Sequence, residues 1–188
     1  MSRSANRPLR FAALLLALGA ATSCASNYRN LDYAPQPAMA IVQPVGATNA
    51  IARVLMTVQG VGYHKEEGYR LELRMRIENR GTEPIDLFAA ELLLVDRTLQ
   101  PFGTPRILDS AGNPTSPTVP GSGVKTFDLV FPFPPNEDDL DLDTLNLKWG
   151  LLHPGGEEVL STTFERLIGY ADSGWRVSPS FSIGIGFD

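Results

Sequence analysis

The sequence feature that most constrains the fold is an unbroken alternation of apolar and charged residues between positions 71 and 78. A period of two places successive side chains on opposite faces of a strand, so the pattern predicts a half-buried β-strand over residues 69–79. The charged positions carry both signs, which favours ion pairs with neighbouring strands on a solvated face. The apolar residues are Leu71, Leu73, Met75 and Ile77, and the charged ones are Glu72, Arg74, Arg76 and Glu78.

Other short runs rich in β-branched and aromatic residues follow, separated by turn residues at 79–81, 109–113 and 120–123. They predict strands over residues 51–63, 85–96, 124–131, 145–151, 158–164 and 176–187. No segment carries a convincing helical stripe. About seven strands with such punctuation predict an all-β fold, an antiparallel Ig-like β-sandwich that occupies residues 50–188.

Residues 1–23 have the order of a secretory signal peptide: a basic stretch with three arginines, an apolar run at 11–21, and small residues just before Cys24. As a helix the eleven-residue run would be about 16 Å long, well short of a hydrocarbon core about 30 Å thick. The segment therefore predicts a cleaved signal rather than a spanning anchor.

Cys24 is the one cysteine of the chain, which excludes an intramolecular disulfide framework. The residues Ala21-Thr22-Ser23-Cys24 resemble a bacterial lipobox. This resemblance implies that Cys24 is acylated and becomes the mature N-terminus, and that Ala25 after it directs the protein to the outer membrane of a bacterium with two membranes. Several acyl chains would hold a protein stably on a bilayer. The alternative is an ordinary signal peptide followed by an unmodified cysteine.

The excess of acidic over basic residues narrows the classes of partner that the chain can bind. The chain has 16 basic and 21 acidic residues, and removal of residues 1–23 would leave a net charge of −8 over 165 residues. This balance argues against nucleic acid as a partner and against attachment to anionic headgroups through a basic patch. The acyl chains would then provide the membrane attachment, and no cofactor is implied.

Residues 24–49 contain three prolines among small and polar residues and have no sustained periodicity. The segment therefore predicts the lipidated cysteine and a linker that lifts the domain off the membrane. The alternative is that Tyr28, Leu31, Tyr33 and Ile41-Val42 dock onto the domain as irregular coil.

The run Leu71-Glu72-Leu73-Arg74-Met75-Arg76-Ile77-Glu78-Asn79-Arg80-Gly81-Thr82-Glu83-Pro84-Ile85 joins an alternating strand, a short polar turn, and a proline that opens the next strand. This unit is similar to late-embryogenesis-abundant type 2 (WHy-like) domains and to small Ig-like lipoprotein domains of unknown function. The resemblance spans about residues 50–165. It implies a fold and an association with the envelope or with stress protection, and it brings no catalytic residues.

Asp139, Asp141 and Asp143 have the spacing of the first three ligands of an EF-hand. An EF-hand is excluded because Thr144 stands at the position that needs glycine and Gly150 at that of the bidentate glutamate. A cation site of another type remains an alternative to a solvated acidic loop.

His64 and His153 are the two histidines, each beside turn-like residues, and no Gly-x-Ser-x-Gly elbow is present. A catalytic triad assembles across a fold, so an envelope hydrolase stays open as an alternative. A cleft that brings either histidine within hydrogen-bond reach of a serine and an acid would favour it.

Large apolar residues alternate with Ser and Gly at the end of the chain. This segment either closes the sandwich or adds a strand to a partner's sheet, as in a secretion or assembly accessory protein. Its candidate partner-binding residues are Trp175, Phe181, Ile183, Ile185 and Phe187. The whole sequence favours a lipid-anchored envelope lipoprotein whose β-sandwich is a non-catalytic binding or structural module.

Overall fold

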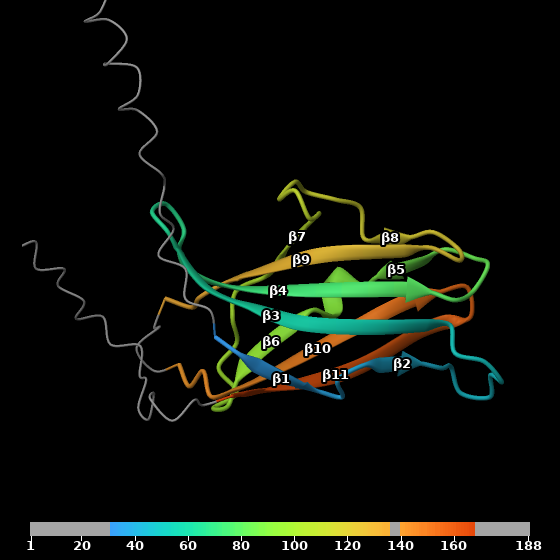
Figure 1. The fold of residues 1–188 in the computed structure, drawn as a ribbon, viewed down its shortest axis with the longest axis horizontal. Coiled ribbons are helices and arrows are strands. Elements are labelled where there is room, and N and C mark those ends of the chain that lie inside the picture. The colour runs from blue at the N-terminus through green and yellow to red at the C-terminus, as the bar shows by residue number, and fades with distance from the viewer. Residues whose placement is uncertain (1–30, 136–139, 168–188) are drawn as a thin grey trace, which may run out of the picture.

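The computed structural model describes residues 31–135 and 140–167. Within these ranges the chain forms two antiparallel sheets that pack face to face, with a single turn of 3₁₀ helix, η1 (Ala89–Glu91) (Figure 1). The antiparallel β-sandwich predicted from the sequence is confirmed. The strands are β1 (Tyr33–Gln36), β2 (Ala40–Val42), β3 (Ala52–His64), β4 (Gly68–Asn79), β5 (Ile85–Leu87), β6 (Leu93–Asp96), β7 (Arg106–Leu108), β8 (Thr118–Val119), β9 (Val124–Pro132), β10 (Thr144–His153) and β11 (Gly156–Arg166).

Sheet A has the order β2-β3-β4-β9-β7, and sheet B has the order β1-β11-β10-β5-β8 with β6 also paired to β10. The alternation of β4 places its four apolar residues on the inner face, where all four are fully buried. Across the core, Trp149 of β10 is also fully buried, and its indole Nε1 donates a hydrogen bond to Thr162 Oγ1 at 3.1 Å. The apolar periodicity of the strands thus accounts for the core between the two sheets.

The segment before residue 50 differs from its prediction. Residues 33–36 and 40–42 are strands, and they add one edge to sheet B and one to sheet A. Leu31 and Tyr33 are only 8% exposed, and the Tyr33 hydroxyl donates to the Leu142 carbonyl at 2.6 Å. Burial raises the pKa of this hydroxyl well above its ordinary value. The linker interpretation is therefore wrong for this part of 24–49. The alternative is right that Leu31, Tyr33 and Val42 dock onto the domain, but residues 33–36 and 40–42 do so as paired strands and not as irregular coil.

The described strands also outnumber the predicted seven. The predicted strand over 85–96 is two strands, β5 and β6, separated by η1, and both pair with β10. The Phe88 N–H donates to the Gly150 carbonyl at 2.9 Å where the chain leaves β5. Strands β7 and β8 are too short for a period of two to be visible in the sequence.

A β-bulge in β3 changes which residues face the core. The register with β4 shifts between Val58 and Gly60, and Gly60 has a φ of 144°. Even-numbered residues face inward before the bulge, whereas Val61 faces inward after it. His64 consequently shares the outer face of sheet A with its register partner Gly68. A bulge adds one residue to one strand and so reverses the faces beyond it.

Candidate functional site

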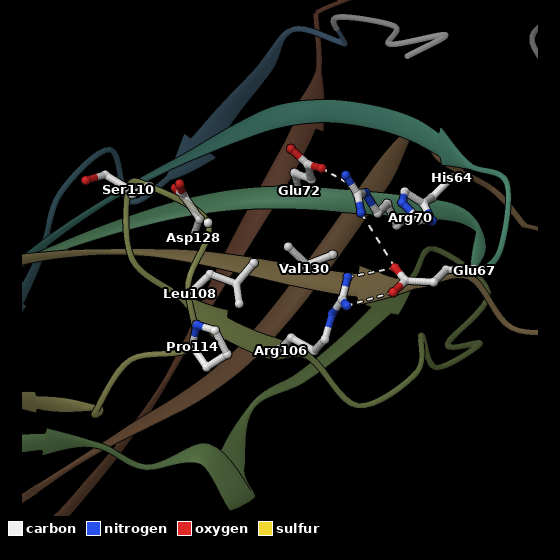
Figure 2. A pocket seen from close by; sticks show the side chains of 12 residues that line it. His64, Glu67, Arg70, Glu72, Arg106, Leu108, Ser110, Pro114, Asp128 and Val130 are labelled. Atoms are coloured by element: carbon white, nitrogen blue, oxygen red, sulfur yellow. Dashed lines mark hydrogen bonds and ion pairs between the residues drawn. The ribbon is translucent and has the colours of Figure 1, made fainter. Parts of the chain in front are cut away.

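A groove of about 560 Å³ lies on the outer face of sheet A, near the β3–β4 hairpin. The outer residues of β4, β9 and β7 form its floor, and the loop after β7 forms one wall (Figure 2). Its lining residues are His64, Glu67, Arg70, Glu72, Arg106, Leu108, Ser110, Ala111, Gly112, Pro114, Asp128 and Val130.

Strand register brings the charged residues of the groove together. Glu72 of β4 is opposite Val130 of β9, and Val130 is in turn opposite Arg106 of β7. Arg70 lies two residues before Glu72 and therefore on the same face. Residues that are far apart in sequence thus form one row across three strands.

Glu67, in the turn between β3 and β4, occupies the arginine end of the groove (Figure 2). Its two carboxylate oxygens each accept a hydrogen bond from Arg106, at 2.7 and 2.7 Å. Arg70 Nη1 lies 3.6 Å from Glu67 Oε2. Desolvation, which opposes ionisation, is outweighed by the hydrogen bonds and charge of Arg106 and by the charges of His64 and Arg70, so the pKa of Glu67 lies below its ordinary value.

Arg70 is less well paired than Arg106. Its Nε lies 2.9 Å from Glu72 Oε1, yet this buried N–H does not point at the oxygen with hydrogen-bond geometry. The guanidinium therefore keeps donor capacity beside the carboxylate of Glu67.

The floor between the two ends is apolar. Val130 is only 4% exposed although it faces outward, and it is not part of the core cluster. Leu108 and Pro114 lie beside it and form an isolated β-bridge with each other (Figure 2). An apolar ligand group can therefore contact protein here without disturbing the core.

Asp109 orders the loop that forms the wall. Its Oδ1 accepts hydrogen bonds from the backbone N–H groups of Asn113 and Ala111, both at 2.9 Å. The bond from the Asn113 N–H, together with the others in this loop, holds the pKa of Asp109 below its ordinary range despite some desolvation. The turn predicted at 109–113 is thus a compact loop closed on its own backbone.

Asp128 and Arg74 form the other charged part of this face. They are register partners on β9 and β4, and Arg74 donates two hydrogen bonds to the carboxylate, at 2.7 and 3.0 Å. The cross-strand ion pairing predicted from the mixed charges of this face is confirmed at this position.

The two histidines occupy different sites. His64 lines the groove, whereas His153 Nδ1 accepts a hydrogen bond from the Gly155 N–H and its Nε2 lies 3.9 Å from Glu158. In residues 31–135 and 140–167, no hydrogen bond joins either histidine to a serine. Within these ranges, therefore, neither histidine has the serine partner that a hydrolase would need at hydrogen-bond distance.

The acidic residues considered as cation ligands have other partners. Asp141 Oδ1 accepts a hydrogen bond from the Asp143 N–H at 3.0 Å, and its Oδ2 is 4.0 Å from Arg97. Asp143 lies 3.6 Å from Arg166. Among residues 31–135 and 140–167, no three acidic, histidine or cysteine side chains converge on a point that could hold a metal ion.

Several predicted features lie outside the described residues. These are Cys24 with its lipobox, Asp139, and the tail strand at 176–187 with Trp175, Phe181, Ile183, Ile185 and Phe187. Over the ranges that are described, no helix combines the length and the hydropathy needed to cross a bilayer.

The sequence prediction placed the charged face of β4 correctly but did not identify the groove that His64 lines. Arg106 lies in a three-residue strand without periodicity, and nothing local indicates that it meets Glu67. The glycines at 60 and 62, next to a charged strand, are the one signal that could have pointed to an irregular outer face.

Comparison with known proteins adds little. No family model matches the chain, and no curated protein matches it. Among solved structures, the "X-ray structure of Northeast Structural Genomics Consortium target SoR45" is similar with a TM-score of 0.32 and 17% sequence identity, over 64% of this chain and 86% of that chain. At this level the similarity carries no functional argument.

Proposed function

We propose that the protein is an exported lipoprotein, held on the membrane by acyl chains on Cys24, whose β-sandwich is a non-catalytic binding module of the cell envelope. The lipobox-like Ala21-Thr22-Ser23-Cys24 carries this proposal together with the burial of a residue that follows it closely. Leu31 follows Cys24 by only seven residues and is buried.

The short connection changes the geometry expected from the sequence. A linker to residue 49 would have let the domain stand up to about 85 Å from the membrane, whereas seven residues reach at most about 25 Å. Strand β1 begins at the same end of the sandwich as the β3–β4 hairpin (Figure 1). The proposal thus has the groove close to the membrane surface, where the module would meet its ligand.

The composition of the groove supports binding rather than catalysis. Its acids and arginines neutralise one another around an apolar floor, which is the composition of a recognition site. A role in envelope maintenance also agrees with the resemblance to WHy-like domains.

The test is Cys24→Ser, followed by cell fractionation and metabolic labelling with palmitate. We expect the wild-type chain to carry label and to sediment with membranes, and Cys24→Ser to lose the label and become soluble after export. A Cys24→Ser/Ser26→Cys chain is the matched control, because a cysteine outside the lipobox should not restore labelling. Continued labelling of Cys24→Ser would refute the proposal.

A further inference from the structure

We propose that the arginine end of the groove is a carboxylate-binding site, which Glu67 of the chain itself occupies in this structure, and that its ligand is a carboxylate on a short apolar chain. The inference rests on the proposed function, since it assigns the ligand class of the binding module.

The geometry at Arg106 is that of carboxylate recognition. Two parallel N–H···O bonds of 2.7 Å join its guanidinium to Glu67. Such a planar, two-bond pairing selects for a carboxylate over a single-atom anion. Because the present occupant is itself a carboxylate, a ligand carboxylate can take its place atom for atom.

Glu67 is suited to leave. Its side chain is 38% exposed and it lies in a hairpin turn, not in a strand. Ion pairs that water can reach contribute little to stability, so a competing anion loses little by displacing it. Once Glu67 swings out, Arg70 Nη1, which lies 3.6 Å from Glu67 Oε2 in this structure, can turn to the same ligand.

The rest of the groove specifies the other part of the ligand. Val130, Leu108 and Pro114 line the path away from the arginines (Figure 2). Asp128 lies at the far end and already accepts two hydrogen bonds from Arg74 on the neighbouring strand, so we place the charged group of the ligand at Arg106. A volume of about 560 Å³ is in the range of small organic ligands.

Competition from Glu67 for the arginines predicts how removal of its charge should change the affinity for a ligand. While Glu67 occupies the arginines, the apparent affinity for a ligand falls in proportion to the fraction of molecules with an open site. Glu67→Gln removes the competing charge and should therefore tighten binding, whereas a residue with a purely structural role would weaken or not alter it.

The experiment is isothermal titration calorimetry of the purified full chain with hexanoate at low salt. We expect Glu67→Gln to bind hexanoate about tenfold more tightly than the wild type, and Glu67→Gln/Arg106→Gln to lose this gain. Glu78→Gln is the matched control, because Glu78 pairs with Arg80 on the same sheet away from the groove. It should bind as the wild type does.

Hexylamine and hexyl phosphate complete the test. Equal binding of hexylamine would show that only the apolar chain is recognised, and tighter binding of hexyl phosphate would overturn the carboxylate assignment. Glu67→Gln that binds hexanoate no more tightly than the wild type would also overturn the proposal. These outcomes are independent of palmitate labelling at Cys24, so failure of the ligand site and failure of the membrane anchor are distinguishable.

Discussion

Asp96, the last residue of β6, and Glu67, in the turn before β4, are both acidic, but they hold their partners in opposite ways. Asp96 is fully buried, and its carboxylate accepts hydrogen bonds from the N–H groups of Thr98, Gln100 and Asp141, each at 2.8 Å. Glu67 is partly exposed and pairs with arginine side chains. A buried acceptor saturated by backbone fixes loops in place, whereas an exposed ion pair can exchange with solvent or a ligand.

We expect the largest change in stability from substitution of Asp96, the buried member of this pair. Asp96→Ala would leave three backbone N–H groups without their acceptor, and we expect a loss of about 4 kcal/mol in the free energy of unfolding. Urea denaturation measures it. Asp128→Ala is the matched control, an acid on the outer face whose removal should cost less than about 1 kcal/mol. Equal losses would show that burial does not separate the two kinds of acid.

Asn79 extends the comparison to a neutral buried group. Its amide is 2% exposed and donates to the carbonyls of Glu83, Pro120 and Val119 at 2.8, 3.1 and 3.3 Å, while its Oδ1 accepts from the Gly81 N–H. Asn79→Ala should therefore lower the unfolding free energy by about 3 kcal/mol. Thermal unfolding of Asn79→Ala beside Asn113→Ala, an exposed loop asparagine, checks this. Similar melting temperatures for the two variants would contradict it.

Glu67→Gln should have the smallest effect on stability and the clearest dependence on pH. The pKa of Glu67 in the folded protein is lowered from 4.5, so its stabilisation is present above pH 4.5 and is lost as the pH falls through the lower folded-state value. We expect a difference from the wild type of less than about 1 kcal/mol at pH 7, vanishing in strong acid.

The measurement is urea denaturation of both chains between pH 7 and pH 2. The same substitution in an Arg106→Gln background serves as the control, because most of the interaction is then already absent. A difference that grows as the pH falls would have the wrong sign for this pairing.

Gly121 lies where two turns, each predictable from its own sequence, are in direct contact. A Cβ on Gly121 would lie 1.8 Å from the Thr82 carbonyl oxygen, so the 120–123 turn packs directly on the turn that Asn79 closes. Both turns were predicted from their Gly, Pro and Asn content. That they touch was not predictable, because 39 residues separate Thr82 from Gly121.

In the groove, too, the features of a single strand were predictable and the contacts between strands were not. The charged face of β4 was predictable because alternation depends only on the pleat of one strand. The row from Glu72 through Val130 to Arg106 depends on which strands pair and in which register, and no local pattern encodes that choice. Strands β1 and β2 were missed for the related reason that edge strands rich in proline and small residues are ordered by their neighbours.

The sequence by itself determined the all-β fold, the core residues of the long strands and the motif that ends in Cys24, because periodicity, turn chemistry and a short motif are all local. Only the tertiary structure decided that Leu31 and Tyr33 belong to the core and that Glu67 meets Arg106. Those features arise from backbone pairing between segments far apart in the chain, and their energy exists only when the two sheets are assembled.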